Sequence, residues 1–153
     1  MGNILRKLLL GGNSIFSITV DTTFGDGLAT YELPITNNTR INAILKVSDG
    51  RPDEVIDTSN MMTKKNITFA TGGIYEIKLV GKGVNIGTRA TTNSKAKLIS
   101  LNSFGYDFKF YYEAFTNCSN LVVNAKYSPN LAGNVTSFFQ GIKNIAPSVD
   151  LST

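Results

Sequence analysis

The chain has 153 residues, of which 42% are hydrophobic and 17% are charged, and its formal net charge is +4. This length suits one domain or two small ones, and the apolar fraction is large enough to bury a core. The sequence has no histidine, which excludes a Ser-His-Asp or Cys-His catalytic site and any zinc site that uses histidine. We therefore expect neither an enzyme nor a cofactor or metal.

Basic residues are scattered along the chain, with no run of five or six and no alternation with aromatic residues. A nucleic-acid-binding surface usually shows one of these patterns, so we expect no nucleic-acid partner. No apolar stretch is long enough to span a bilayer as a helix. A membrane span is therefore not expected either.

The first predicted element is a short helix or extended anchor in residues 1–14, MGNILRKLLLGGNS. Its apolar face carries Ile4, Leu5, Leu8 and Leu9. The run of leucines is shorter than the core of a signal peptide. Two interpretations remain, a terminal helix packed loosely on its own chain and a docking segment that packs on a partner protein. We favour docking, because Gly11-Gly12 separates a short apolar segment from a β-rich body.

Residues 15–87 alternate between short apolar runs and turn signals such as Gly25-Asp26-Gly27 and Asp49-Gly50. Five or six short strands at this spacing are typical of an antiparallel β-sandwich. The runs expected to form strands are 15–20, 29–33, 41–47, 54–57, 66–69 and 74–80.

Two stretches of this region, ILKVSDGRPDEVID and ITFATGGIYEIKLVG, resemble the polycystic-kidney-disease-type (PKD), immunoglobulin-like domain. In that family a strand ends in a Trp-Gly-Asp-Gly turn, and a later strand reads roughly Thr-Tyr-Ala-x-x-Gly-x-Tyr-x-Val. Asp49-Gly50 keep the turn, with Val47-Ser48 in place of the Trp-Gly pair. The positions that fit the second signature are Phe69, Ala70, Gly73 and Tyr75. The resemblance implies an immunoglobulin-like sandwich over 15–87.

The densest acidic cluster is Asp49, Asp53, Glu54 and Asp57. Its spacing does not match the Asp-x-Asp-x-Asp-Gly pattern of a calcium loop, and no pair stands out for glycoside cleavage. Solvated turn residues are the favoured interpretation, ahead of a weak cation site or a catalytic pair.

Residues 88–96 are polar and predict a junction, after which the chain changes character. When Phe115 is placed on Phe139, the tail aligns on itself with the pattern Phe-x-x-(Cys/Ile)-x-Asn-(Leu/Ile). The spacing of these two positions lies in the range of leucine-rich solenoids. The expected repeat core is Phe115, Cys118, Leu121, Phe139, Ile142 and Ile145. Because Cys118 aligns with Ile142, we interpret it as a packing residue and not as a reactive thiol.

The stretches AFTNCSNL, NVTSFFQGIKNI and VDLST resemble the bacterial-surface-protein (BspA-like) type of leucine-rich repeat, whose unit reads Met-Phe-x-x-Cys-x-x-Leu, Leu-Asp-Leu-Ser and Val-Thr-x-Met. The resemblance covers about residues 97–153, with Ile142 where the family has cysteine. It implies a short leucine-rich-repeat-like solenoid after the sandwich, and an activity of binding and not of catalysis.

Together, the sandwich and the repeats resemble proteins of bacterial surfaces and of bacteriophage virions. We expect a virion structural protein, such as a short fibre, spike or capsid- or tail-attached subunit, whose residues 1–14 dock on other virion proteins. The alternative is an adhesin on the bacterial cell surface, for which we would expect a secretion signal and a longer repeat array.

The expected body projects toward the host and forms a homo-oligomer. Aromatic residues at alternating positions, Tyr106, Phe108 and Tyr112, offer a contact strip for a host glycan or protein. The competing interpretation, which we favour, is that these rings belong to the core.

Overall fold

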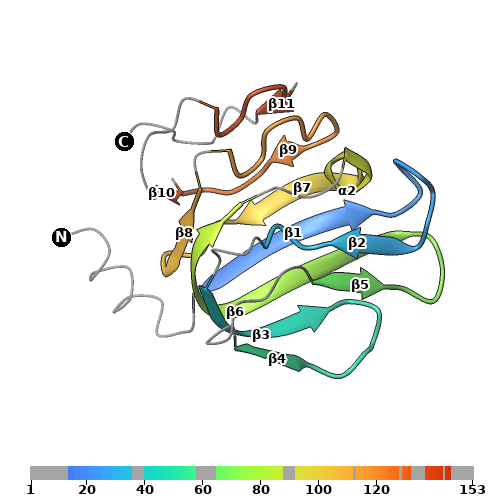
Figure 1. Ribbon diagram of the computed structural model, residues 1–153, viewed down its shortest axis with the longest axis horizontal. Helices are drawn as coiled ribbons and strands as arrows, with labels where there is room; N and C mark the ends of the chain where they lie inside the picture. The colour runs from blue at the N-terminus through green and yellow to red at the C-terminus, as the bar shows by residue number, and fades with distance from the viewer. Residues whose placement is uncertain are drawn as a thin grey trace.

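Figure 1 shows a computed structural model of the chain, which describes residues 14–35, 40–57, 65–87, 92–111, 113–127, 129–131, 137–142 and 144–145. Strands dominate these residues, and the only helix among them is the six-residue α2 (Thr92–Lys97). The prediction of a mainly β protein is confirmed. Of the predicted docking segment 1–14, only Ser14 belongs to the described residues.

Nine strands of the described chain form one sheet, and β1 (Ile15–Asp21) is an inner strand of its antiparallel part. On one side β1 pairs with β6 (Ile74–Ile86), and on the other side with β7 (Leu98–Ser103). Beyond β6 lie β3 (Arg40–Val47) and then β4 (Glu54–Asp57). The order across this part is therefore β4-β3-β6-β1-β7.

The alternation of the sequence decides which side of this sheet is buried. In β3, Ile41, Ala43, Leu45 and Val47 are buried, and the residues between them are exposed or half-buried. Successive side chains of a strand point to opposite faces, so this pattern covers one face of the sheet and leaves the other to solvent.

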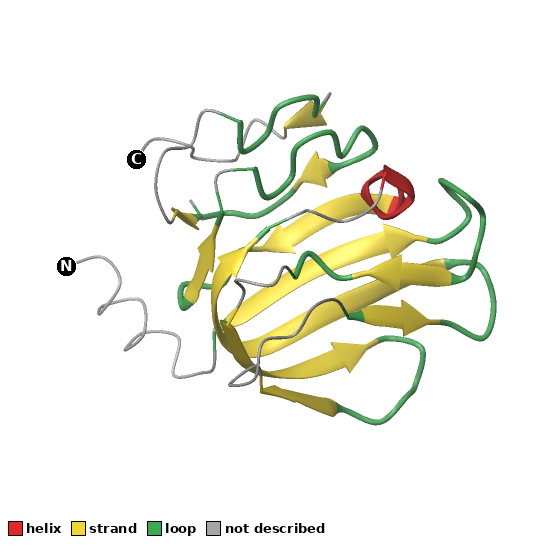
Figure 2. Ribbon diagram, in the orientation of Figure 1, coloured by secondary structure: helices red, strands yellow, loops and turns green. Residues whose placement is uncertain are grey.

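A second, two-stranded sheet of β2 (Thr30–Glu32) and β5 (Asn66–Thr68) lies over the apolar face. Tyr31 of β2 pairs with Ile67 of β5, and each is only 1% exposed. Figure 2 shows this smaller layer in front of β1 and β6. The two sheets have a sandwich-like arrangement, which confirms the sandwich prediction at that level.

The rest of the large sheet is parallel. β9 (Val122–Val123) pairs with β7, and β11 (Asn144–Ile145) pairs with β9, so Ser100, Val122 and Asn144 stand side by side at equal steps along the sequence. A second ladder stacks β8 (Phe108–Phe110) on β6 and β10 (Asn130–Leu131) on β8. Along the chain, β7 to β11 therefore alternate between two ladders. The leucine-rich-repeat-like solenoid expected over 97–153 stays a prediction.

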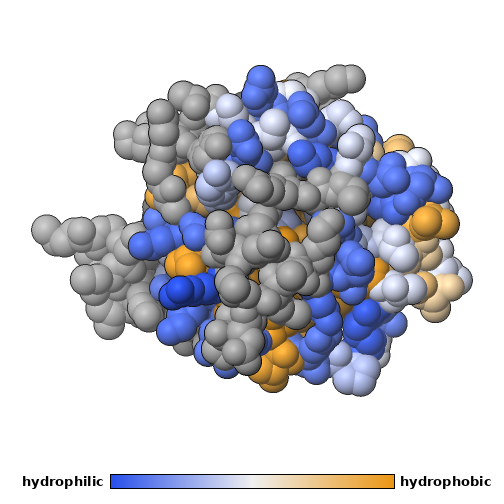
Figure 3. All heavy atoms as spheres, in the orientation of Figure 1, coloured by the Kyte–Doolittle hydropathy of each residue, from blue (hydrophilic) through white to orange (hydrophobic). Residues whose placement is uncertain are grey.

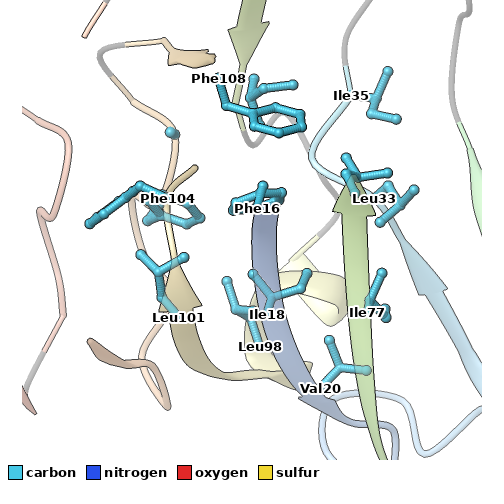
Figure 4. Close-up of a cluster of buried hydrophobic side chains, with 14 of the residues drawn as sticks. Phe16, Ile18, Val20, Leu33, Ile35, Ile77, Leu98, Leu101, Phe104 and Phe108 are labelled. Carbon is cyan, nitrogen blue, oxygen red and sulfur yellow. The ribbon is translucent and has the colours of Figure 1, made fainter. Parts of the chain in front are cut away.

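One hydrophobic cluster runs through both parts of the molecule. In Figure 4, Phe16, Ile18 and Val20 of β1 point into the same core as Leu98 and Leu101 of β7. Described residues of both predicted ranges, 15–87 and 97–153, belong to this core, and all of the described part of the predicted junction, residues 92–96, lies in α2. Figure 3 shows a mostly hydrophilic surface on the viewed face, with apolar side chains in small separate patches.

Candidate functional site

Three loops meet at one end of the sandwich, with residues 22–29 following β1, 48–53 following β3 and 69–73 preceding β6. They gather because β1 and β3 run toward this end while β6 starts from it, as the pairing of Asp21 with Ile74 requires. Ser14 lies at the opposite end, where Ile15 pairs with Val80. Figure 1 shows the three loops at the right of the view. The length of β1 separates the two ends by about 20 Å.

Thr22 joins the first of these loops to the third. Its backbone N–H donates to the carbonyl of Gly73 at 2.9 Å, and its hydroxyl accepts from the Gly73 N–H at 2.9 Å. The same hydroxyl donates to the Gly73 carbonyl at 3.2 Å. Thr22 is completely buried, so all three bonds are shielded from water.

Arg51 holds the second loop against the third. Its Nη2 donates to the carbonyl of Thr68 at 2.7 Å, and its guanidinium lies 5.3 Å from the centre of the Phe69 ring. Asp49 accepts from the Arg51 Nε at 2.9 Å, and this hydrogen bond lowers the pKa of the Asp49 carboxyl. Phe69 in turn stacks on Tyr75, with 4.0 Å between ring centres.

Lys97, the last residue of α2, binds the first loop through its side chain. Its side chain is 1% exposed, and Nζ donates to the carbonyls of Leu28 and Thr30, each at 2.9 Å. It also pairs with Asp26 at 2.6 Å, and this hydrogen bond lowers the pKa of the Asp26 carboxyl. Asn93 adds a hydrogen bond of 3.2 Å from its amide to Asp26.

Gly25 allows the first loop to approach α2 closely. Its φ of +68° lies in the left-handed region, and a Cβ there would come within 2.8 Å of the Asn93 carbonyl. Only glycine fits both the backbone conformation and the close approach.

Large apolar side chains project from this braced end. Phe24 is 43% exposed, Leu28 is 59% exposed and Ile74 is 64% exposed. Loops that are held in place before binding lose less conformational entropy when a partner arrives. This end of the molecule, which we call the loop end (residues 22–29, 48–53 and 69–74), therefore has the properties of a contact surface for another macromolecule.

Of the residues predicted for docking and for glycan contact, the structure describes only Tyr106 and Phe108. Ile4, Leu5, Leu8, Leu9 and Tyr112 fall outside the described residues. Phe108 is completely buried, and 5.9 Å separate the centre of its ring from that of Phe16. Phe108 is therefore a core residue, as in the interpretation that we favoured over a contact strip. Tyr106 is half-buried and makes its own polar or ring contacts.

Four of the six residues predicted as a repeat core, Phe115, Cys118, Phe139 and Ile142, lie at two turns with matching geometry. The N–H of Cys118 donates to the Phe115 carbonyl, and the N–H of Ile142 donates to the Phe139 carbonyl, both at 3.2 Å. The residues just before, Asn117 and Gly141, have φ of +62° and +81°. Phe115, Cys118 and Leu121 are buried, while Phe139 and Ile142 pack against the core from half-buried positions. The backbone of Ile145 pairs with Val123.

The environment of Cys118 is apolar. Burial raises the pKa of its thiol to about 12, although Lys95 acts in the opposite direction. At neutral pH the thiolate that would act as a nucleophile is therefore scarce.

The acidic residues after β3 are engaged in ion pairs on the surface. Asp49 pairs with Arg51, Asp53 with Lys46, and Glu54 with Lys65. Among the residues that the structure describes, no three of histidine, cysteine, aspartate and glutamate gather as a metal site would require.

Sequence reasoning treated Gly25-Asp26-Gly27 only as a turn and Lys97 only as a basic residue. The signal for the loop end was present in Phe24 and Leu28, two large apolar residues inside a turn that needs neither for its conformation. No pattern indicated the bracing by Lys97, because most of the sandwich lies between it and Asp26 in the sequence.

Comparison with known proteins gives no relative: no family model, no curated protein and no solved structure matches the chain. In the part of the chain that is described, none of the helical residues forms a segment long and apolar enough to cross a bilayer.

Proposed function

We propose that the chain is a structural protein of a bacteriophage virion, a short fibre, spike or capsid- or tail-attached subunit that binds and does not catalyse. In this proposal residues 1–14 dock on another virion protein, and the β-rich body projects from the particle. The observation that carries the proposal is that the N-terminal segment and the loop end lie at opposite ends of the sheet. The chain enters at Ser14, and the braced loop end lies at the far end of β1.

The strand order supports the resemblance of residues 15–87 to an immunoglobulin-like sandwich. In that fold one sheet carries the order C′-C-F-G and the facing sheet carries B next to E. Here β4-β3-β6-β1 and β2-β5 have the same arrangement, with β1 in the place of G although it comes first in the chain. The residues that carry the PKD-like signature also meet, since Phe69 stacks on Tyr75 and Arg51 joins Phe69 to Asp49.

The C-terminal part supports the resemblance to leucine-rich repeats in a similar way. The turns at Phe115–Cys118 and Phe139–Ile142 have the same hydrogen bonds, and β7, β9 and β11 pair at positions 100, 122 and 144. Both spacings lie within the period of leucine-rich repeats. We propose that residues 97–153 form a short BspA-like array that begins on the edge of the sandwich.

Within this proposal, host contact belongs to the loop end and not to the aromatic strip at Tyr106, Phe108 and Tyr112. Phe24, Leu28 and Ile74 are exposed there, whereas Phe108 is buried. A distal surface with braced loops and apolar side chains suits attachment to a host-surface protein or glycan.

Electron microscopy of particles labelled with an antibody against residues 15–153 tests the proposal. We expect label at fixed positions on the particle. Deletion of residues 1–13 should abolish the label while keeping the fold, because the carbonyl of Ser14 still accepts from Gly81 N–H at 2.8 Å. A matched control replaces Leu28 and Ile74 by Ser, which should keep the label and reduce host binding. Label on the cell envelope and on no particle would instead support the adhesin.

A further inference from the structure

The outer face of the large sheet carries one continuous apolar row. Val55 of β4, Ile44 of β3, Val80 of β6 and Ile15 of β1 stand side by side in register across four strands. Val55 is 74% exposed, Ile15 is 39% exposed and Ile44 is 37% exposed. An apolar row open to water on the outside of a sandwich costs free energy unless another surface covers it.

Charged residues flank this row in an ordered way. On the β4 side, Asp53 and Asp57 stand on either side of Val55 along the chain, and Asp57 pairs with Asn42 in register. On β6, Lys78 and Lys82 stand on either side of Val80, and Lys82 pairs with the same Asn42. Strand β3 therefore runs between an acid-Val-acid strand and a Lys-Val-Lys strand, with Ile44 at the centre.

The charges of β4 and β6 are complementary to one another, and Lys46, between them on the same face of β3, is paired with Asp53 of its own chain. A two-fold axis in the plane of the interface and parallel to β3 exchanges β4 of one copy with β6 of the other. The exchange brings Asp57 opposite Lys82 of the second copy, Val55 opposite Val80, and Ile44 opposite Ile44. We propose that the outer face of β4, β3 and β6 is a two-fold interface between two copies of this chain. Two sheets packed face to face at their usual separation of about 10 Å have this geometry.

The proposed face is small. Three strands about 4.8 Å apart and three rows about 6.7 Å apart give a patch of roughly 300 Å² per copy. This is well under half of what each partner contributes to a stable complex, so we expect a weak free dimer, with a dissociation constant on the order of 100 µM. The proposal does not depend on the virion function, although two copies held close together on a particle would associate more completely.

Sedimentation equilibrium from 5 to 500 µM, on the full chain and its variants, tests the interface. The wild type should change from monomer to dimer over this range. Asp57→Lys alone and Lys82→Asp alone should each raise the dissociation constant at least tenfold, because each places two like charges opposite one another at both of the symmetry-related contacts, one on each side of the axis. An equimolar mixture of the two variants should recover the dimer, because every such pair is then of opposite sign. A matched control, Leu28→Asp, changes an exposed apolar residue of the loop end that lies outside the large sheet, and it should leave association unchanged.

Chemical cross-linking gives a second readout. Ile44→Cys lies on the proposed axis, where sheets about 10 Å apart hold the two thiols too far apart for a disulfide but within reach of a short bismaleimide. The variant should therefore form a cross-linked dimer with this reagent, whereas Leu28→Cys should not. The native Cys118 does not interfere, because it is completely buried. The proposal is overturned by a wild type that stays monomeric to 500 µM, by a trimer, by a dimer that the two charge variants leave intact, or by a mixture that does not recover it.

Discussion

The part of the molecule formed by β1 to β6 and the part formed by β7 to β11 are built on different principles. The first has antiparallel strands of up to thirteen residues, and its loops are held by side chains from distant segments, such as Lys97 on Asp26 and Arg51 on Phe69. The second has strands of two to six residues in parallel ladders, and its turns are closed by local bonds such as Cys118 to Phe115. In the first part, contacts between segments far apart in the sequence hold the loops in place. In the second part, hydrogen bonds within each turn do so.

The two parts nevertheless depend on one another through β1. Phe16 lies 5.3 Å from Phe110 and 5.9 Å from Phe108, so the first strand supplies a ring to the aromatic core of the second part. Short strands bury little apolar surface by themselves and need neighbours to cover it. Here β1 of the sandwich packs on the rings of β8, and we expect the two parts to unfold together.

The largest expected effect comes from removing a ring of the shared core. Phe115 is completely buried among Phe104, Phe110, Phe138 and Phe139, at ring-centre distances of 5.3 to 6.4 Å. Phe115→Ala should lower the free energy of unfolding by about 3–5 kcal/mol. Urea unfolding followed by circular dichroism measures the loss, and Tyr127→Ala, at an exposed ring, is the control.

Amide hydrogen exchange of Phe115→Ala tests whether the two parts unfold as one unit. Amides of β3 in the sandwich should lose protection together with those of β7, since one core supports both parts. Protection that falls in β7 to β11 while β3 stays unchanged would show two independent units.

The bracing of the loop end is the next largest effect. Lys97→Met keeps the length of the side chain but removes the donor to the carbonyls of Leu28 and Thr30, of which Leu28 still accepts from the Thr30 N–H at 2.7 Å. The loss of these bonds should cost about 1–3 kcal/mol in stability. Faster hydrogen exchange should be confined to residues 24–30. Lys95→Met, on the same helix, is the control, and an unchanged exchange rate in 24–30 would contradict the bracing role.

Cys118 predicts a pH dependence in the C-terminal part. Burial raises the pKa of its thiol from 9.0 to about 12, so ionisation favours the unfolded chain above pH 9. The stability due to the protonated thiol is present below pH 9 and is lost as the pH rises toward 12. Between pH 8 and 10, the wild type should lose about 1.4 kcal/mol more than Cys118→Val. Tyr31 is present in both proteins, and burial is the largest cause of its raised pKa, ahead of its interaction with Cys118. Equal losses in the two proteins would contradict this account.

Features that depend on neighbouring residues could be predicted from the sequence. Alternation in Ile41–Val47 identifies β3 and its buried face, because a strand's side chains follow a local period of two. The match of the tail on itself found Phe115 and Cys118 as equivalents of Phe139 and Ile142, because local turns repeat in the sequence when they repeat in the structure.

Other features have no local signature. The pairing of β1 with both β6 and β7 joins segments that lie far apart in the sequence, and no period in the chain indicates it. The same holds for Lys97, which sequence analysis left at the start of the repeat region and which in fact supports a loop of the sandwich. The loop end was missed because it exists only through such distant contacts.

The smallest expected effect tests whether the loops are ordered by contacts with distant segments or by their own glycine and turn residues. Thr22→Val removes the hydroxyl that accepts from the Gly73 N–H at 2.9 Å while it keeps the branched shape. The loss should be about 1 kcal/mol, since one buried donor is left unpaired but the backbone bond from Thr22 to Gly73 remains. Thr68→Val, at an exposed position of β5, should change stability little. If Thr22→Val has no larger effect than this control, the loops owe their order to glycine and turn chemistry alone. If the Gly73 amide exchanges faster while β7 to β11 are unaffected, order at the loop end depends on contacts between distant segments.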